Sequence, residues 1–191
     1  MSERERVTVS ATKRDPKAPP KVLILTKESV ALSQLETAIW LWFNYGDPVS
    51  ILQLAAAAND CYSALGAHVG QPSLYQTWLK SQSKGFQDRA RYVQNWIKHG
   101  AKDMKKRPRY SPRLAEVMMI DSVNCHRNLA GKNTTLTRLY FARFSFENPE
   151  IVVPEKRAFF IKGVEVYGML DLDRIQFLQV FLERLSALSG A

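Results

Sequence analysis

Apolar residues recur every three or four positions along most of this chain, which is the spacing of one face of an α-helix. The pattern is clearest over 27–44, where the apolar positions of one face are 30, 31, 35, 38, 39, 42 and 43. Asp47 and Pro48 then suit an N-cap and a first helical position, so we expect a second helix over 49–65 that Gly66 ends. Two helices joined by such a tight turn should pack as an antiparallel pair.

The same periodicity predicts further helices in the rest of the chain. They cover 74–80, 86–99, 113–129, 134–146 and 172–188. Ser73 and the pair Ser111-Pro112 are the expected caps of two of them, and Gly131 is an expected stop. Short connections between so many helices are typical of a bundle.

The segment 151–167 has a different pattern. Its runs 151–153 and 159–161 are rich in β-branched and aromatic residues, and Lys162-Gly163 could form a two-residue turn. This permits a small β-hairpin near 151–167. We therefore predict a mainly α protein, a helical bundle of about six to seven helices, with that hairpin as its only β-structure.

Composition supports a packed core and bears on whether the protein spans a membrane and in which compartment it lies. Hydrophobic residues make up 46% of the 191, and the longest uninterrupted apolar run is 38–43. A membrane span needs ~20 apolar residues. Proline and charge over 1–22 predict a basic disordered tail, followed by a single helical domain over 23–191. Two cysteines without motif spacing and the lack of an apolar signal at the N-terminus favour a cytoplasmic protein.

Charge changes this picture most. The net charge is +9, with 27 Lys and Arg against 18 Asp and Glu. Residues 80–113 alone carry eleven basic and two acidic side chains, whereas 1–26 have a net charge of +3, 27–79 of −3 and 114–191 of zero. A basic excess in one short window is the footprint expected of an anionic partner, although a charged window can also be a solvated face.

The helix predicted over 86–99 places unusual chemistry side by side. Arg91, Asn95, Lys98 and Lys102 form one stripe, and Tyr92, Trp96 and His99 form the next. Basic groups neutralise phosphates and aromatic rings stack on unpaired bases. We therefore name as nucleic-acid-binding candidates Lys98, Lys102, Lys105, Lys106, Arg107, Arg109, Tyr92 and Trp96. The candidates for chemistry are His99, Arg91 and Asn95.

A structural interpretation of the same residues stays open. Tyr92 and Trp96 would then be core residues, and His99 would interact with the carbonyl end of its helix. The three histidines are each alone in sequence, so no metal site is expected, and neither is another cofactor. No phosphate-binding loop and no nucleophile elbow is present in the sequence.

The stretch Asn95-x-x-Lys98-His99-x-x-x-Asp103, on a middle helix of a small bundle, resembles the active-site helix of HEPN-type proteins and of bacterial proteins of similar length. The resemblance covers about 27–147. It implies a helical bundle, often dimeric, that binds or cuts RNA without metal, with His99 as the base and an upstream arginine that stabilises the phosphorane. In that pattern four to six residues separate the arginine from the histidine, whereas seven separate Arg91 from His99.

Two functions follow as hypotheses. The first is a basic helical protein that binds RNA, in preference to DNA, or another polyanion, either as a metal-independent ribonuclease or by binding alone. The second is a non-catalytic interaction subunit whose basic window docks on an acidic protein surface or on a membrane. Its aromatic-rich helix over 27–44 would be a partner surface. Trp40 and Trp42 point to different sides of that helix, so both can be buried only if the helix is covered on two sides, by core or by an interface. A homodimer is compatible with both hypotheses.

Overall fold

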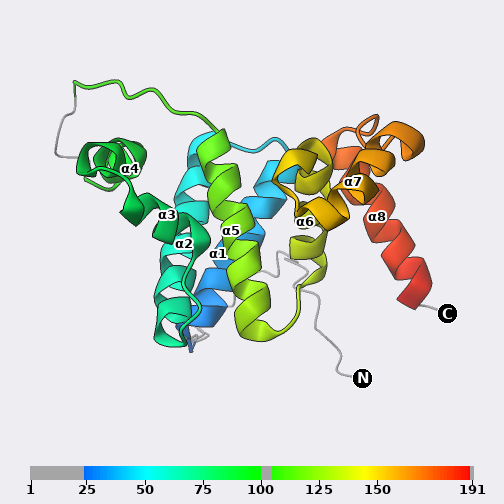
Figure 1. Cartoon of the computed structure of the whole chain (residues 1–191), viewed down its shortest axis with the longest axis horizontal. Coiled ribbons are helices and arrows are strands. Elements are labelled where there is room, and N and C mark those ends of the chain that lie inside the picture. Colours follow the sequence, from blue (N-terminus) through cyan, green and yellow to red (C-terminus); the bar gives the residue numbers. More distant parts are fainter. Residues whose placement is uncertain (1–23, 100–104, 190–191) are drawn as a thin grey trace, which may run out of the picture.

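The computed structural model describes residues 24–99 and 105–189. These residues form α-helices and one short 3-10 helix, without a strand (Figure 1). The elements in chain order are α1 (Lys27–Phe43), α2 (Pro48–His68), α3 (Leu74–Ser81), α4 (Lys84–Lys98), α5 (Arg113–Ala130), α6 (Thr135–Glu147), η1 (Pro149–Ile151), α7 (Pro154–Tyr167) and α8 (Arg174–Ser189). The predicted mainly α fold is confirmed.

The antiparallel pair α1–α2 begins with strong local signals. Thr26 and Ser29 form a reciprocal capping box at the start of α1. Asp47 accepts a hydrogen bond from the Ser50 backbone N–H at 2.7 Å and so caps α2, with Pro48 at the first helical position. Buried alanines at positions 55, 56 and 58 of α2 let the two helices approach closely.

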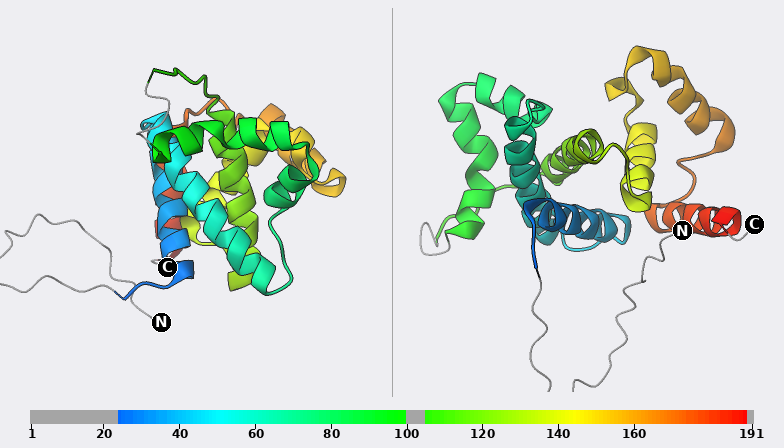
Figure 2. Two further views of the ribbon diagram at one scale, coloured as in Figure 1. Left: turned by 90° about the vertical axis from the view of Figure 1, so that its left-hand side faces the viewer. Right: turned by 90° about the horizontal axis from the view of Figure 1, so that it is seen from below.

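Helix α5 is the central element of the bundle. It packs against α1 and α2, and it lies between the α3–α4 pair on one side and α6–α8 on the other (Figure 2). Met118, Met119 and Val123 of α5 are fully or almost fully buried against α1 and α2. Burial of each side chain of this size contributes roughly 1.5–3 kcal/mol to the stability of the bundle.

Aromatic rings join α6, α7 and α8 to the rest of the bundle. Phe146 of α6 contacts Phe160 of α7 and Phe177 of α8, at ring-centroid distances of 5.3 and 6.3 Å. Phe177 also stacks on Phe43 of α1 at 6.3 Å. The last helix is therefore tied to the first through one row of rings.

The predicted β-hairpin near 151–167 is wrong, because this segment forms η1 and α7. Pro154 occupies the first helical position and Glu155 lies in the first turn, where an acidic side chain favours a helix. Phe160 and Gly163 are buried one turn apart on the face that packs on α6. Tertiary packing has overridden the β-propensity of the two phenylalanines.

Two predicted helix ends also differ from the structure. Helix α2 continues through Gly66 to His68, and Gly66 is buried because the backbone of Gln71 returns over it and donates to its carbonyl at 2.7 Å. Pro112, not Ser111, is the N-cap of α5, and no side chain caps this end. The predicted tail over 1–22 lies outside the described residues. No described helix is both long and apolar enough to cross a membrane.

Candidate functional site

Helix α4 carries five of the eleven predicted site residues and packs on the bundle by one face only. Ser83 caps it through a hydrogen bond from the Phe86 backbone N–H. Phe86, Ala90, Val93 and Ile97 are half-buried against the core, as the periodicity predicted, and Gln94 is the buried residue of the helix. The opposite face is exposed and carries polar and charged side chains.

A chain of side-chain hydrogen bonds attaches α4 to the centre of the molecule. The Arg91 guanidinium donates to Gln76 Oε1 at 3.0 Å. The amide of Gln76 donates to Asn59 Oδ1 at 3.0 Å, and the amide of Asn59 donates to Asp121 Oδ2 at 2.7 Å. Helices α4, α3, α2 and α5 are thereby connected through buried or half-buried polar atoms.

Asp121 is the anchor of this chain. Its buried carboxylate accepts hydrogen bonds from Ser73 Oγ at 2.6 Å and from the backbone N–H groups of Leu74 and Tyr75 at 3.0 and 3.1 Å. It therefore neutralises the N-terminus of α3 from a different helix. Sequence reasoning missed this role. The available signal was an aspartate inside an otherwise apolar stretch of α5.

The three candidates for chemistry lie in different surroundings. Arg91 is half-buried and directed to Gln76 of α3. Asn95 is exposed, and His99 is the exposed C-cap of α4, where its backbone N–H donates to the Asn95 carbonyl at 2.9 Å. Arg91 and His99 are eight positions apart, which is about 12 Å of helix rise. Arg91 therefore lies near the middle of α4, whereas His99 lies at its C-terminal end, two turns further along.

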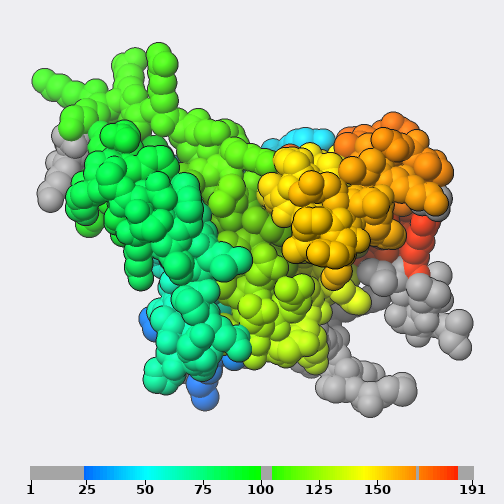
Figure 3. All heavy atoms as spheres, viewed as in Figure 1, coloured from blue at the N-terminus to red at the C-terminus, as the bar shows by residue number. Residues whose placement is uncertain are grey.

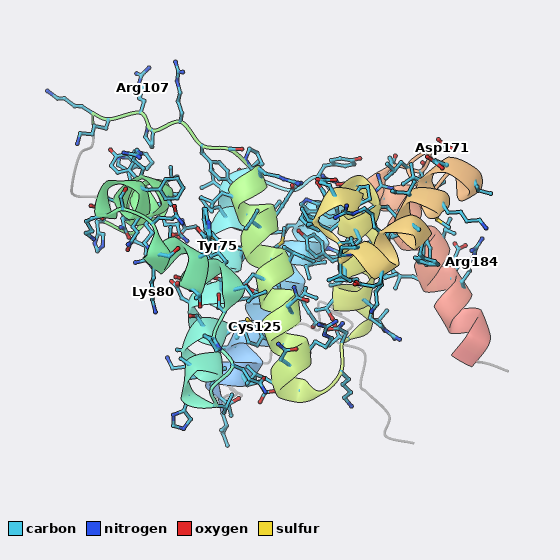
Figure 4. The ribbon with its side chains drawn as sticks, in the orientation of Figure 1. Tyr75, Lys80, Arg107, Cys125, Asp171 and Arg184 are labelled. Carbon is cyan, nitrogen blue, oxygen red and sulfur yellow. The ribbon has the colours of Figure 1, made fainter. Side chains whose placement is uncertain are left out.

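The basic candidates gather beside α4. Lys98 is exposed and lies 3.9 Å from the exposed Asp60, a long contact that contributes little. Lys105, Lys106, Arg107 and Arg109 are exposed on the extended segment before α5, and Lys102 lies outside the described residues. Figure 4 shows Arg107 pointing away from the body of the molecule, and the segment that begins at residue 105 stands out from the surface in Figure 3.

Aromatic and basic groups meet where this segment passes α4. The Lys106 ammonium lies 6.0 Å from the centroid of the Tyr92 ring. Tyr92 and Trp96 are both half-buried, and they lie one turn apart on α4. Arg89 adds a further exposed cation on α4, whereas Lys84 is paired with Asp88 at 2.8 Å. We call the exposed residues Lys98, Lys105, Lys106, Arg107 and Arg109 with Tyr92 and Trp96 the basic surface.

A second charged cluster joins α8 to the bundle. Buried Glu116 accepts hydrogen bonds from the Trp42 indole at 2.9 Å and from Arg174 at 3.2 Å. The Arg174 guanidinium lies 3.6 Å from the centroid of Trp42 and also pairs with Glu147 at 3.4 Å. A hollow of about 280 Å³ opens beside Arg174. The charges of this cluster pair with one another, so its role is to hold α8 against α5 and α6.

Two further candidate groups, His126 and Cys125 of α5, are buried. Burial lowers the pKa of His126, whose Nδ1 is hydrogen-bonded to the Tyr62 hydroxyl at 3.1 Å. Burial raises the pKa of the Cys125 thiol to about 12, so this thiol is unreactive. Among the residues the structure describes, no three His, Cys, Asp or Glu side chains are placed to hold a metal ion.

Comparisons of this chain with protein-family models, with curated proteins and with solved structures find no match. The resemblance to HEPN-type proteins therefore stays a prediction.

Proposed function

We propose that this protein binds single-stranded RNA through the basic surface and does not cleave it. The observation that carries the proposal is the exposed cations of the segment 105–109, one of which, Lys106, lies over the half-buried Tyr92 ring of α4. Cations that lie along the sugar–phosphate backbone of RNA neutralise its phosphates, and unpaired bases stack on aromatic ring faces next to them. The aromatic groups favour RNA over a polyanion without bases.

The placement of Arg91 supports binding without cleavage. A transition-state role would require its guanidinium to approach a phosphate held at His99. Its hydrogen bond to Gln76 instead directs it towards α3, within the polar chain that anchors α4. Arg91 therefore acts as a positioning residue for the helix that carries the surface.

The binding test is a salt titration of a fluorescein-labelled 20-nucleotide RNA, measured by anisotropy with the full chain. The variant Lys105→Ala/Lys106→Ala/Arg107→Ala should bind at least tenfold more weakly, and its slope of log K against log salt should fall by about 2. The matched control is Lys132→Ala/Arg138→Ala/Lys162→Ala, which removes three exposed cations from elsewhere. If both variants lose affinity equally, binding follows net charge and the proposed surface is wrong.

The cleavage test uses the same RNA with chelator present. Intact RNA after prolonged incubation with the wild type is the expected result. Chelator-resistant cutting that disappears in His99→Ala would contradict binding without cleavage and would make His99 the base that the resemblance implies. Unlabelled heparin and single-stranded DNA as competitors then measure how much of the affinity depends on the bases and on the 2′-hydroxyl.

A further inference from the structure

A long apolar depression runs along the face of α5 that is turned away from α1 and α2. Two hollows of about 410 and 420 Å³ adjoin there and share Leu74, Ile120 and Asn124. One is bounded by α3 and the other by α6, η1 and α7. We call this the α5 groove and define it by Leu74, Trp78, Ile120, Phe141, Ile151 and Val153.

The rim of the α5 groove exposes large apolar side chains. Leu74 is 73% exposed, Trp78 50%, and Ile151 and Val153 are each 55% exposed. Scattered apolar residues are normal on a protein surface, whereas residues on both walls of one groove form a continuous apolar site. In Figure 3 the α5 surface lies between α3 on one side and α6–α7 on the other.

We propose that the α5 groove binds an amphipathic helix of a partner protein that carries acidic residues beside its apolar stripe. The groove has α5 as its floor, with α3 on one side and α6, η1 and α7 on the other. Apolar side chains at helical spacing on a partner helix would fit between these two walls. The charge beside the groove indicates which partner fits. Arg127 and Lys156 are exposed cations at the α7 end, and the Asp121 carboxylate at the other end is saturated by its own donors.

The same charges disfavour the chain's own N-terminal segment as the occupant. Residues 1–26 have six basic and three acidic side chains, so they would bring cations to Arg127 and Lys156. An acidic helix would instead gain two favourable contacts at this end, which fix its direction in the groove. The proposal goes beyond RNA binding and depends on different residues, so either can fail alone.

The probe comes from a displayed library of 16-residue helical peptides selected on the full chain. We expect enrichment of peptides with apolar residues at positions i, i+3, i+4 and i+7 and with acidic residues beside them. The enriched peptide is then labelled, and its affinity is measured by anisotropy. Leu74→Glu and Val153→Glu should each weaken binding at least tenfold. Val69→Glu is the control, because Val69 is also 55% exposed but lies outside the groove.

A charge exchange tests the direction of the helix. Arg127→Glu/Lys156→Glu should lose affinity for the acidic peptide and gain it for the same peptide with lysines in place of its acidic residues. Failure to enrich any peptide, or equal binding by all variants, would overturn the proposal. So would displacement of the probe by a synthetic peptide of residues 1–22, or a dimer that Val153→Glu dissociates, because these outcomes identify another occupant.

Discussion

The Asp121 carboxylate shows how one residue determines the position of two helices. It accepts four hydrogen bonds from Asn59, Ser73 and the first backbone N–H groups of α3. A buried carboxylate is tolerated only where donors replace its hydration, and here every donor comes from an element that must be held against α5. Through Gln76 and Arg91, the same carboxylate supports the helix that carries the basic surface.

Asp121→Asn should therefore destabilise the protein by about 3 kcal/mol, because an amide nitrogen would replace an acceptor among four donors. Urea unfolding followed by circular dichroism measures this change. Asp60→Asn is the control, since the Asp60 side chain is 59% exposed and its substitution should change stability by less than about 0.5 kcal/mol. Equal effects of the two substitutions would show that Asp121 does not anchor α3.

At the scale of elements, the contact between α6 and α7 depends on the absence of one side chain. A Cβ atom on Gly163 would lie 2.4 Å from Cε1 of the Phe146 ring. That ring cannot easily move away, because it is packed against Phe160 and Phe177. Gly163 therefore sets how closely α7 approaches the bundle.

Gly163→Ala should destabilise the protein by about 1–3 kcal/mol, although alanine is ordinarily the better helix former by about 1 kcal/mol. Gly85→Ala in α4 is the matched control. Its Cβ would meet only Arg89 Nη1 at 3.6 Å, so this variant should be as stable as the wild type or more stable. Thermal melts of both variants test the pair. A gain of stability in Gly163→Ala would mean that α7 is not packed against Phe146.

The same elements explain how far sequence reasoning reached. Caps and periodicity predicted α1–α6 and α8 closely, because Asp47, Ser73 and Gly131 act locally. They failed for α7, where packing on α6 decided between helix and strand. The basic residues could be located from their concentration in 80–113. The hydrogen-bonded chain and the α5 groove could not, because they join residues from helices whose spatial order the sequence does not state.

At the scale of the whole molecule, two surfaces of different physical character share one bundle. The basic surface would bind through charge, whereas the α5 groove would bind mainly through burial of apolar side chains. Salt separates these mechanisms, because it competes with phosphate contacts and hardly affects apolar burial. Measuring the affinities for RNA and for the groove peptide before and after a fourfold rise in salt concentration therefore shows whether the two ligands share one surface or bind two.

Five cations in contact with single-stranded RNA give a slope of log K against log salt near −3.5, so a rise from 50 to 200 mM should weaken RNA binding by about 100-fold. Over the same range the groove peptide, with only two exposed charge contacts, should lose no more than about threefold. Anisotropy titrations of both ligands on the same preparation of full-length chain measure the two responses. Parallel losses would mean that the peptide and the RNA compete for the basic surface. Different losses, with neither ligand displacing the other, would establish that a charged site and an apolar site operate separately on one small helical protein.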